Sequence, residues 1–318
     1  MKAVCYFCML TYFLTTPFIP FMLIIKLFGG LGNQIFQYAL GRHLALKNNI
    51  PLFLDTFSGF QDDFYQRNYT LDIFKIPANI ADKNLIEKIN RLQNPLGRKD
   101  KFQNWLTKNI FQFNPLFING KHFQYDPEIF HLQTKFAYVS GYWQTEKYFK
   151  EIENTIRQDL TFVNPISSEN QDLKAAIQES NSVCLHVRRL LGIAEGKINA
   201  DGVKFHGSAS LDYYSKALNI ITQQEQQPHF FVFADEPAWA KENIKLPYPT
   251  TFVEGNADFE DLQLMSLCKH HIIANSSFSW WAAWLNANPE KIVIMPKAWF
   301  ADQSVNTSDV CPVTWLSI

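Results

Sequence analysis

The sequence is short of net charge and of cysteine. Lysine and arginine number 29 against 30 aspartate and glutamate residues, which gives a formal net charge of -1. A chain without a positive excess has no general attraction for nucleic acid or anionic lipid, so an anionic ligand must meet a local group of positive charges. Five scattered cysteines in 318 residues form no disulfide framework, which favours a reducing compartment. We therefore expect a cytoplasmic globular protein with a ligand pocket.

Charge is absent altogether from residues 3–25. Such a run is typical of a signal peptide or a membrane anchor. However, Pro17 and Pro20 would interrupt a spanning helix, and the run continues without a linker into residues 22–28, which read as a buried strand. Two interpretations stay open. Residues 1–21 are either a tail or a mis-annotated extension, or a membrane signal that holds the protein peripherally at the inner membrane.

Short apolar runs alternate with segments of helical period, which is the pattern of parallel α/β units. In the first half we expect strands at residues 22–28 and 50–54, with helices at 34–47 and 147–159. In the second half we expect strands at residues 183–187, 230–233, 251–253, 272–274 and 292–295, with helices centred near Ala217, Ala240, Leu264 and Ala283. Residues 164–170 have linker composition. We therefore predict two doubly wound domains, residues 22–165 and 166–318.

A glycine-rich segment, residues 29–34 (GGLGNQ), lies between the first predicted strand and the first predicted helix. Backbone amides and a helix N-terminus converge there, and glycine permits the close approach of a ligand. Gly30 and Gly32, with Asp55 after the next strand, match most of a dinucleotide-binding fingerprint, so an NAD-dependent oxidoreductase is an alternative, although the third glycine is missing. A purely structural tight turn is another. Asn33 and the following glutamine add side-chain donors, which favours a ligand-binding loop.

Two adjacent arginines, Arg188 and Arg189, follow the predicted strand at residues 183–187. Ligands of open α/β sheets bind at the carboxyl ends of the strands. Neighbouring guanidinium groups repel one another, and each suits a phosphate bidentately, so a diphosphate would satisfy both. Ion pairing with surface carboxylates is the structural alternative. His186 is interpreted either as a core histidine or as a nucleotide contact.

A second anion site is predicted at residues 275–281 (NSSFSWW), where a strand is followed by a helix. Ser276 and Ser277 can cap this helix while their hydroxyls and the nearby amides face a phosphate. An ordinary capped helix is the alternative. Asp261, at the start of an earlier helix, suits the helix dipole, and its second interpretation is an acceptor of two hydrogen bonds from a guanine edge.

Taken in order, residues 29–34, 186–189 and 275–281 resemble glycosyltransferase family 11, the α-1,2-fucosyltransferase family. Residues 141–148, 231–235 and 264–269 also look like that family. The resemblance implies a GT-B-like fold of two Rossmann-type domains, with GDP-fucose held mainly by the second. It implies inverting transfer of L-fucose to the 2-hydroxyl of a β-galactoside. A relative that binds a GDP-sugar but has altered or lost transferase activity is the alternative.

The resemblance also implies roles for single residues. Arg188 and Asn33 are expected to be catalytic, with Asn33 near the scissile bond. The expected donor-binding residues are Gly30, Gly32, His186, Arg189, Asp261, Ser276, Ser277 and Phe278. As the sugar–phosphate bond breaks, negative charge grows on the β-phosphate, and arginines already in place stabilise that transition state. No metal or other cofactor is expected, in keeping with the lack of an Asp-x-Asp sequence.

The acid that usually follows the arginines in this family is missing, because Leu191 occupies its position. We expect Glu195 or Asp201, from the loop that follows, to orient the arginines instead. The general base that would accept the proton of the acceptor hydroxyl stays open. The candidates are Asp55, Asp62, Asp63, Glu195 and Asp201.

Overall fold

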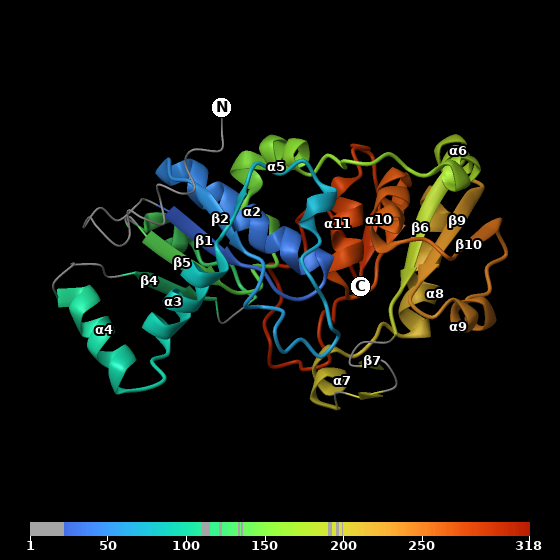
Figure 1. Ribbon diagram of the computed structural model, residues 1–318. Helices are drawn as coiled ribbons and strands as arrows, with labels where there is room; N and C mark the ends of the chain where they lie inside the picture. Colours follow the sequence, from blue (N-terminus) through green and yellow to red (C-terminus); the bar gives the residue numbers. More distant parts are fainter. Residues whose placement is uncertain are drawn as a thin grey trace.

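The protein contains two parallel β-sheets, shown in the computed structural model of Figure 1. The structure describes residues 22–109, 115–120, 123–132, 134, 136–189, 193–194, 197–198 and 200–318. The first sheet has the order β3-β2-β1-β5-β4, and all of its strands are parallel. Its strands are β1 (Met22–Lys26), β2 (Leu52–Asp55), β3 (Asn79–Ile80), β4 (Leu116–Asn119) and β5 (Phe136–Ser140).

The second sheet has the order β10-β9-β6-β11-β12-β13 and is also parallel throughout. Its strands are β6 (Asn181–Val187), β9 (Pro228–Ala234), β10 (Thr250–Val253), β11 (His270–Ile272), β12 (Val293–Met295) and β13 (Leu316–Ser317). A separate antiparallel pair joins β7 (Ile193–Ala194) to β8 (Lys197–Ile198).

Helices cover both faces of each sheet. The α-helices are α2 (Leu31–Asn48), α3 (Lys83–Gln93), α4 (Arg98–Asn109), α5 (Glu153–Asp159), α6 (Gln171–Glu179), α7 (Ala200–His206), α8 (Leu211–Gln224), α9 (Pro237–Asn243), α10 (Asp258–Leu267) and α11 (Ser277–Leu285). The 3₁₀ turns are η1 (Leu71–Ile73), η2 (Pro127–His131), η3 (Glu146–Tyr148), η4 (Lys150–Ile152) and η5 (Ser168–Asn170). None of the helices in the described part of the chain is both long and apolar enough to cross a membrane.

The two-residue period of a strand divides its side chains between the helices on either face. In β1, Leu23 and Ile25 belong to the core that contains α2, whereas Met22 and Ile24 pack with the residues of α3. The central strand of the second sheet, β6, behaves in the same way. Val183, Leu185 and Val187 pack with residues of α8 and α9, and Cys184 belongs to the core that contains α10 and α11.

The predicted fold class, two doubly wound α/β sheets, is confirmed. Every strand expected from sequence is present, with ends that differ by a few residues. The helix expected at residues 147–159 is shorter, because η3 and η4 precede α5. The strands β3, β4 and β5 and the helices α3 and α4 were not predicted, since the polar and aromatic sequence there has no clear period. The domain boundary after residue 165 stays a prediction, and residues 1–21 lie outside the described residues.

The two sheets are joined where the first turns of α2 and α11 meet. A Cβ atom placed on Gly32 would lie 2.4 Å from the carbonyl carbon of Ser277, so the two backbones touch through the missing side chain. One turn further along, the ring of Phe36 lies 4.6 Å from that of Trp280 and 4.9 Å from that of Trp281, centroid to centroid. All three rings are fully buried. The apolar core therefore runs from the first sheet into the second without a break.

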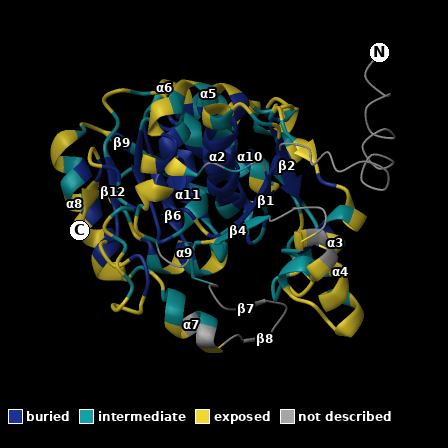
Figure 2. Cartoon of the chain, turned by 90° about the vertical axis from the view of Figure 1, so that its left-hand side faces the viewer, coloured by how far each residue is buried: buried dark blue, intermediate teal, exposed yellow. Residues whose placement is uncertain are grey.

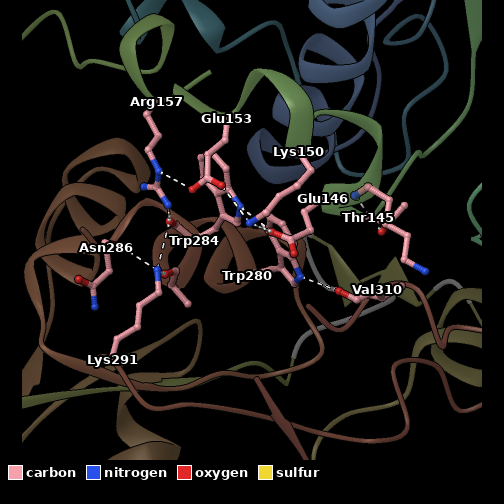
Figure 3. A network of polar contacts seen from close by, with 12 residues as sticks. Thr145, Glu146, Lys150, Glu153, Arg157, Trp280, Trp284, Asn286, Lys291 and Val310 are labelled. Carbon is pink, nitrogen blue, oxygen red and sulfur yellow. Dashed lines mark hydrogen bonds and ion pairs between the residues drawn. The ribbon is translucent and has the colours of Figure 1, made fainter. Parts of the chain in front are cut away.

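The other end of α11 is held by cations (Figure 3). Arg157 of α5 donates to the carbonyls of Trp284 at 2.8 Å and Leu285 at 3.3 Å, while its Nε bonds Glu153 at 3.0 Å. Lys291 donates to the carbonyls of Ala283 and Asn286 at 2.8 and 2.7 Å. Positive charge at a helix C-terminus satisfies its last carbonyls and suits its dipole. As a result, α11 is fixed at both ends, with its N-terminus at the join between the sheets.

We predict that Gly32→Ala destabilises the protein by about 1–3 kcal/mol, because the new methyl group must displace the backbone of Ser277. Urea unfolding followed by circular dichroism measures the change. Gly97→Ala is the matched control, since a Cβ there would meet nothing within 4 Å. Equal stability changes in the two variants would contradict the close contact.

Candidate functional site

A cavity of about 760 Å³ lies between the two sheets, at the join of α2 and α11. Its wall takes residues from both halves of the chain. From the first half come Gly29, Gly30, Gly32, Asn33, Asp63, Arg67, Tyr142 and Gln144. From the second half come His186, Arg188, His206, Asp235, Asp258, Asp261, Ser276, Ser277, Phe278 and Trp299. The three motifs that the sequence keeps far apart therefore meet around one space.

The glycine-rich turn is built by its side chains as well as by glycine. Gly29 has a φ of +75°, a left-handed conformation that glycine adopts without strain. The buried side chain of Gln34 donates to the carbonyls of Gly29 at 3.0 Å and Asn68 at 2.9 Å, and it accepts from the backbone N–H of Thr70 at 3.0 Å. Gln34 is thus a structural clamp between the turn and the loop at residues 63–70. The prediction that this glutamine donates to a ligand is therefore wrong, because its NH2 group already donates to two backbone carbonyls.

Gly32 lines the cavity, but protein backbone, not ligand, is what requires glycine there. Gly30 is the N-cap of α2. Because glycine has no side chain, the backbone amides in the first turn of α2 have no side-chain acceptor from the N-cap residue. A Cβ placed on Gly30 would lie 3.9 Å from Nε of Arg67. The binding roles of both glycines stay predictions.

Asn33 is held in one orientation by a relay of amides. Its Oδ1 accepts from Nε2 of Gln144 at 2.8 Å, and Oε1 of Gln144 accepts from the indole N–H of Trp299 at 3.0 Å. The relay commits the oxygen of Asn33 and leaves its NH2 group without a partner among the described residues. A donor fixed in this way at the cavity wall can meet an anionic or polar group of a ligand.

The two neighbouring arginines separate. Arg188 lines the cavity, and its Nη1 lies 3.3 Å from Oδ2 of Asp235. Arg189 is not part of the cavity wall. Its guanidinium pairs with Glu236 at 2.9 Å and stacks over the ring of Trp239 at 3.9 Å. The expectation that both arginines face one anion therefore does not match their arrangement, and a phosphate contact by Arg189 stays an untested prediction.

Asp235 supplies the carboxylate that the sequence lacks after the arginines. It follows β9, whose last residue Ala234 is in register with Val187 of β6. Besides pairing with Arg188, it accepts the backbone N–H of Arg189 at 3.0 and 3.1 Å. The sources predicted instead cannot be placed, because Glu195 lies outside the described residues and the side chain of Asp201 is not described.

A second guanidinium, that of Arg67, reaches the cavity from the first half of the chain. Asp63 accepts the backbone N–H groups of Tyr65 and Arg67 at 3.0 Å each, and its other oxygen lies 3.7 Å from Nη1 of Arg67. The guanidinium carbon lies 3.9 Å from the centre of the Tyr65 ring. Sequence reasoning missed Arg67, since the stretch around it has no clear period. The one signal was the spacing of an acid, an aromatic and an arginine.

Arg67 and Arg188 both line the cavity, and their charges act on one another. Burial lowers the pKa of Arg67, and the charge of Arg188 lowers it further, while Asp63 opposes the shift. Burial also lowers the pKa of His206, with further contributions from the charges of both arginines. The cavity therefore gathers positive charge from two sides in a protein whose overall charge is -1. Such a space favours a polyanion.

His186 and Asp261 lie in the wall with shifted pKa values. Burial, then the charge of Arg188, lowers the pKa of His186 to about 4, so the ring is neutral at pH 7, and its Nδ1 has no partner among the described residues. Burial raises the pKa of Asp261 to about 6, although it accepts a hydrogen bond of 2.9 Å from Asn256. His186 is buried and Asp261 is half-buried, and both line the cavity with a shifted pKa, which is typical of ligand contacts.

The predicted serine loop also lines the cavity. Ser276 is the N-cap of α11, as expected, but its side chain makes no cap hydrogen bond. The first-turn amides of α11 therefore keep their capacity to bind an anion. Phe278 lies against His186, with ring centroids 6.0 Å apart. Asn275, next to the loop, is committed to structure through its hydrogen bond of 3.0 Å to the carbonyl of His206.

Asp55 does not have the ribose-binding role of the dinucleotide interpretation. It is fully buried and absent from the cavity wall. Its carboxylate accepts from the hydroxyls of Tyr138 and Ser58 and from the backbone N–H of Phe57, so it closes the turn after β2. Asp62 is exposed and likewise lies outside the wall. Of the five candidate bases, Asp63 is the one with a described side chain that lines the cavity.

The sequence matches the model of Glycosyl transferase family 11 over residues 21–318. It is 33% identical over 307 residues to an alpha-1,2-colitosyltransferase of Escherichia coli, covering 93% of this chain and 99% of that protein. It is 30% identical over 318 residues to the O-antigen biosynthesis glycosyltransferase WbnK of Escherichia coli, covering 91% and 98%. A more distant relative is galactoside alpha-(1,2)-fucosyltransferase 2 of Sus scrofa, 22% identical over 287 residues, covering 85% and 72%.

Among solved structures, a mutant of Arabidopsis thaliana FUT1 in complex with GDP matches with a TM-score of 0.51 and 13% identity, covering 87% of this chain and 70% of that chain. At this identity the likeness concerns the fold alone, and it confirms the predicted GT-B-like arrangement. The family resemblance seen in the three motifs is confirmed by the family model and by relatives of nearly equal length. This protein belongs to glycosyltransferase family 11.

Proposed function

We propose that this glycosyltransferase transfers L-fucose from GDP-fucose to the 2-hydroxyl of a β-galactoside, with inversion and without a metal. One observation carries the proposal: Arg188 and the N-terminus of α11, which has no side-chain cap, line the same cavity. A nucleoside diphosphate has the charge and the size for this arrangement. The names of the relatives, which include an alpha-(1,2)-fucosyltransferase, support the sugar and the linkage.

In this proposal the guanosine lies against the second sheet. The carboxylate of Asp261 accepts hydrogen bonds from the guanine edge, and the neutral ring of His186 contacts the nucleoside. Ser276, Ser277 and Phe278 surround the diphosphate with the first-turn amides of α11. The matching complex of the Arabidopsis protein with GDP supports a guanine nucleotide in a fold of this kind.

Catalysis would come from charge that is already in place. When the bond from C1 to the phosphate oxygen breaks, negative charge grows on the β-phosphate, and Arg188 stabilises it more strongly than it stabilises the bound donor. Asp235 fixes the direction of Arg188 at 3.3 Å, which avoids reorganisation during the reaction. Arg67 would complete the clamp from the first sheet. With cations on two sides, the leaving group requires no metal.

The acceptor hydroxyl would reach the anomeric carbon near Asn33, whose amide orientation is fixed by Gln144. Asp63 is poorly suited to act as a strong base, since it accepts two backbone N–H groups and pairs with Arg67. In the proposed reaction the rate therefore depends on stabilisation of the leaving group, and the acceptor hydroxyl loses its proton late.

A second donor is favoured by one specific observation, the 33% identity to an alpha-1,2-colitosyltransferase. That relative covers the chain almost end to end, so a colitosyl group from a nucleotide sugar is the alternative to fucose. The proposed contacts to the diphosphate and to the base serve either donor. Parallel incubations with the two donors decide between them.

We predict that purified protein incubated with GDP-fucose and lactose in EDTA forms a fucosylated trisaccharide, detected by mass spectrometry. Arg188→Ala is expected to lower kcat/KM by two to three decades, about 3–4 kcal/mol, because it removes a transition-state cation. Asp235→Asn should lower it by less.

The neighbouring Arg189→Ala is the matched control. It removes an exposed ion pair that contributes about 0–1 kcal/mol, so its effect should stay within about fivefold. Full activity of Arg188→Ala would refute the clamp. GDP binding by the wild type without transfer from either donor would select a relative that has lost its activity.

We predict that Arg67→Ala lowers the affinity for GDP by about tenfold or more, which corresponds to the loss of a charge-assisted hydrogen bond. The affinity for GMP should change little. The reason is that Arg67 is proposed to contact the β-phosphate, which GMP lacks. Isothermal titration calorimetry with both nucleotides makes the comparison. Equal losses for GDP and GMP would instead assign Arg67 to the folding of its loop.

Asp261 gives the binding of GDP a pH dependence. Its pKa of about 6 in the free protein means that the carboxylate becomes protonated as the pH falls through 6 and then no longer accepts from guanine. The affinity for GDP should therefore fall between pH 7.5 and pH 5.5. The terminal phosphate of GDP also titrates near pH 6. The variant Asp261→Asn retains only the pH dependence that comes from this phosphate. Identical pH profiles of variant and wild type would therefore exclude the proposed role of Asp261.

A further inference from the structure

The helices α3 and α4, with the turn between them, form a basic hairpin, residues 83–109. It contains five lysines and two arginines against one glutamate and one aspartate, a net charge of +5. The whole chain carries -1, so the remainder of the chain carries -6. Within the described part of the chain, none of these seven cations lies within ion-pair distance of a carboxylate, whereas cations elsewhere commonly do. The positive charge of the hairpin is therefore uncompensated.

Large apolar side chains stand among these cations. Leu96, in the turn, is 86% exposed, and on α4 Phe102 and Trp105 are 61% and 55% exposed. The two rings are stacked, with centroids 6.2 Å apart. Of the other seven tryptophans, six are buried in the core and Trp239 is partly buried. Figure 2 shows the exposed surface of α4 projecting from the body of the molecule near the edge of the first sheet.

Among the described residues, the apolar packing of the hairpin against the body comes from α3. Ile86 and Ile89 of α3 are buried against Phe53 and Tyr138, whereas α4 contributes no residue to the cores formed by the described residues. Its connection back to α3 is made by Asn104, whose Nδ2 donates to two carbonyls there at 3.1 and 3.2 Å. Nothing in the packing of the core therefore requires an aromatic residue on the outer surface of α4.

We propose that the outer surface of α4 docks on an anionic lipid bilayer. A tryptophan and a phenylalanine flanked by lysines are suited to the headgroup region, where the rings enter the apolar boundary and the ammonium groups meet phosphates. Each cation near an acidic membrane surface adds to the attraction, and salt screens it. A bilayer fits better than a duplex nucleic acid, because the exposed Leu96, Phe102 and Trp105 can enter the apolar boundary of a bilayer, whereas the backbone of a duplex offers them only charge.

This docking is independent of the proposed sugar transfer, because the hairpin contributes no residue to the cavity wall. It would fix the first sheet against the membrane surface and leave the second sheet, which carries the proposed nucleotide contacts, free of the bilayer.

Co-sedimentation of the full chain with vesicles tests the proposal. We expect binding to vesicles of equal parts phosphatidylcholine and phosphatidylglycerol, weak binding to pure phosphatidylcholine, and a loss of binding as salt is raised. The double variant K99E/K101E changes the local charge by four and should weaken binding to the acidic vesicles about tenfold or more. F102S/W105S keeps every charge and should also weaken it.

The matched control is K216E/K245E, which makes the same change in net charge on exposed lysines of the second half of the chain. All variants retain residues 1–21, so any contribution from that apolar segment is common to them. Equal losses in the control and in K99E/K101E would overturn the assignment to α4. Equal binding of the wild type to neutral and acidic vesicles would overturn the role of anionic lipid. Retention by heparin without binding to vesicles would overturn the bilayer as partner.

Discussion

Backbone contact between the first turns of α2 and α11 is the constraint on which the rest of the structure depends. Gly32 has no side chain, so the backbone of Ser277 can lie against it, and the two helix N-termini meet at one edge of the cavity. The tryptophans and Phe36 then bury the join, and Arg157 and Lys291 secure the far end of α11. Because helix N-termini attract anions, this packing by itself creates a place for a phosphate.

The charges of the cavity follow from that geometry. Each wall arginine has one carboxylate, Asp63 for Arg67 and Asp235 for Arg188, which directs the guanidinium and leaves further donors for a ligand. Arg189 differs, because its guanidinium pairs with Glu236 and stacks on Trp239 outside the cavity. An acid that follows another strand, Asp235, stands beside Arg188 where the family's usual acid is missing. A parallel sheet makes this arrangement possible, since adjacent strands end side by side.

Much of the fold was predictable from sequence because its strands are apolar runs separated by segments of helical period. Alternation is of little use where both faces of a sheet are covered, as in β6, so the short continuous run was the signal. The prediction failed between β2 and β5. There the strands β3 and β4 are short, and most described residues of α4 are exposed. The sequence of these elements therefore has no regular period of apolar residues. Arg67 belongs to this stretch, which is why sequence reasoning overlooked it.

Sequence alone determined the family, the fold class and the three motifs that surround the cavity, because each motif is a local arrangement of glycine, arginine or serine at the end of a strand. Tertiary structure decided how those residues are used. It assigned Gly32 to backbone packing, Gln34 to a clamp and Asp55 to a buried turn, and it brought Arg67 and Arg188 to the wall of one cavity. The directions of side chains depend on neighbours from distant parts of the chain, and local pattern carries no record of those neighbours.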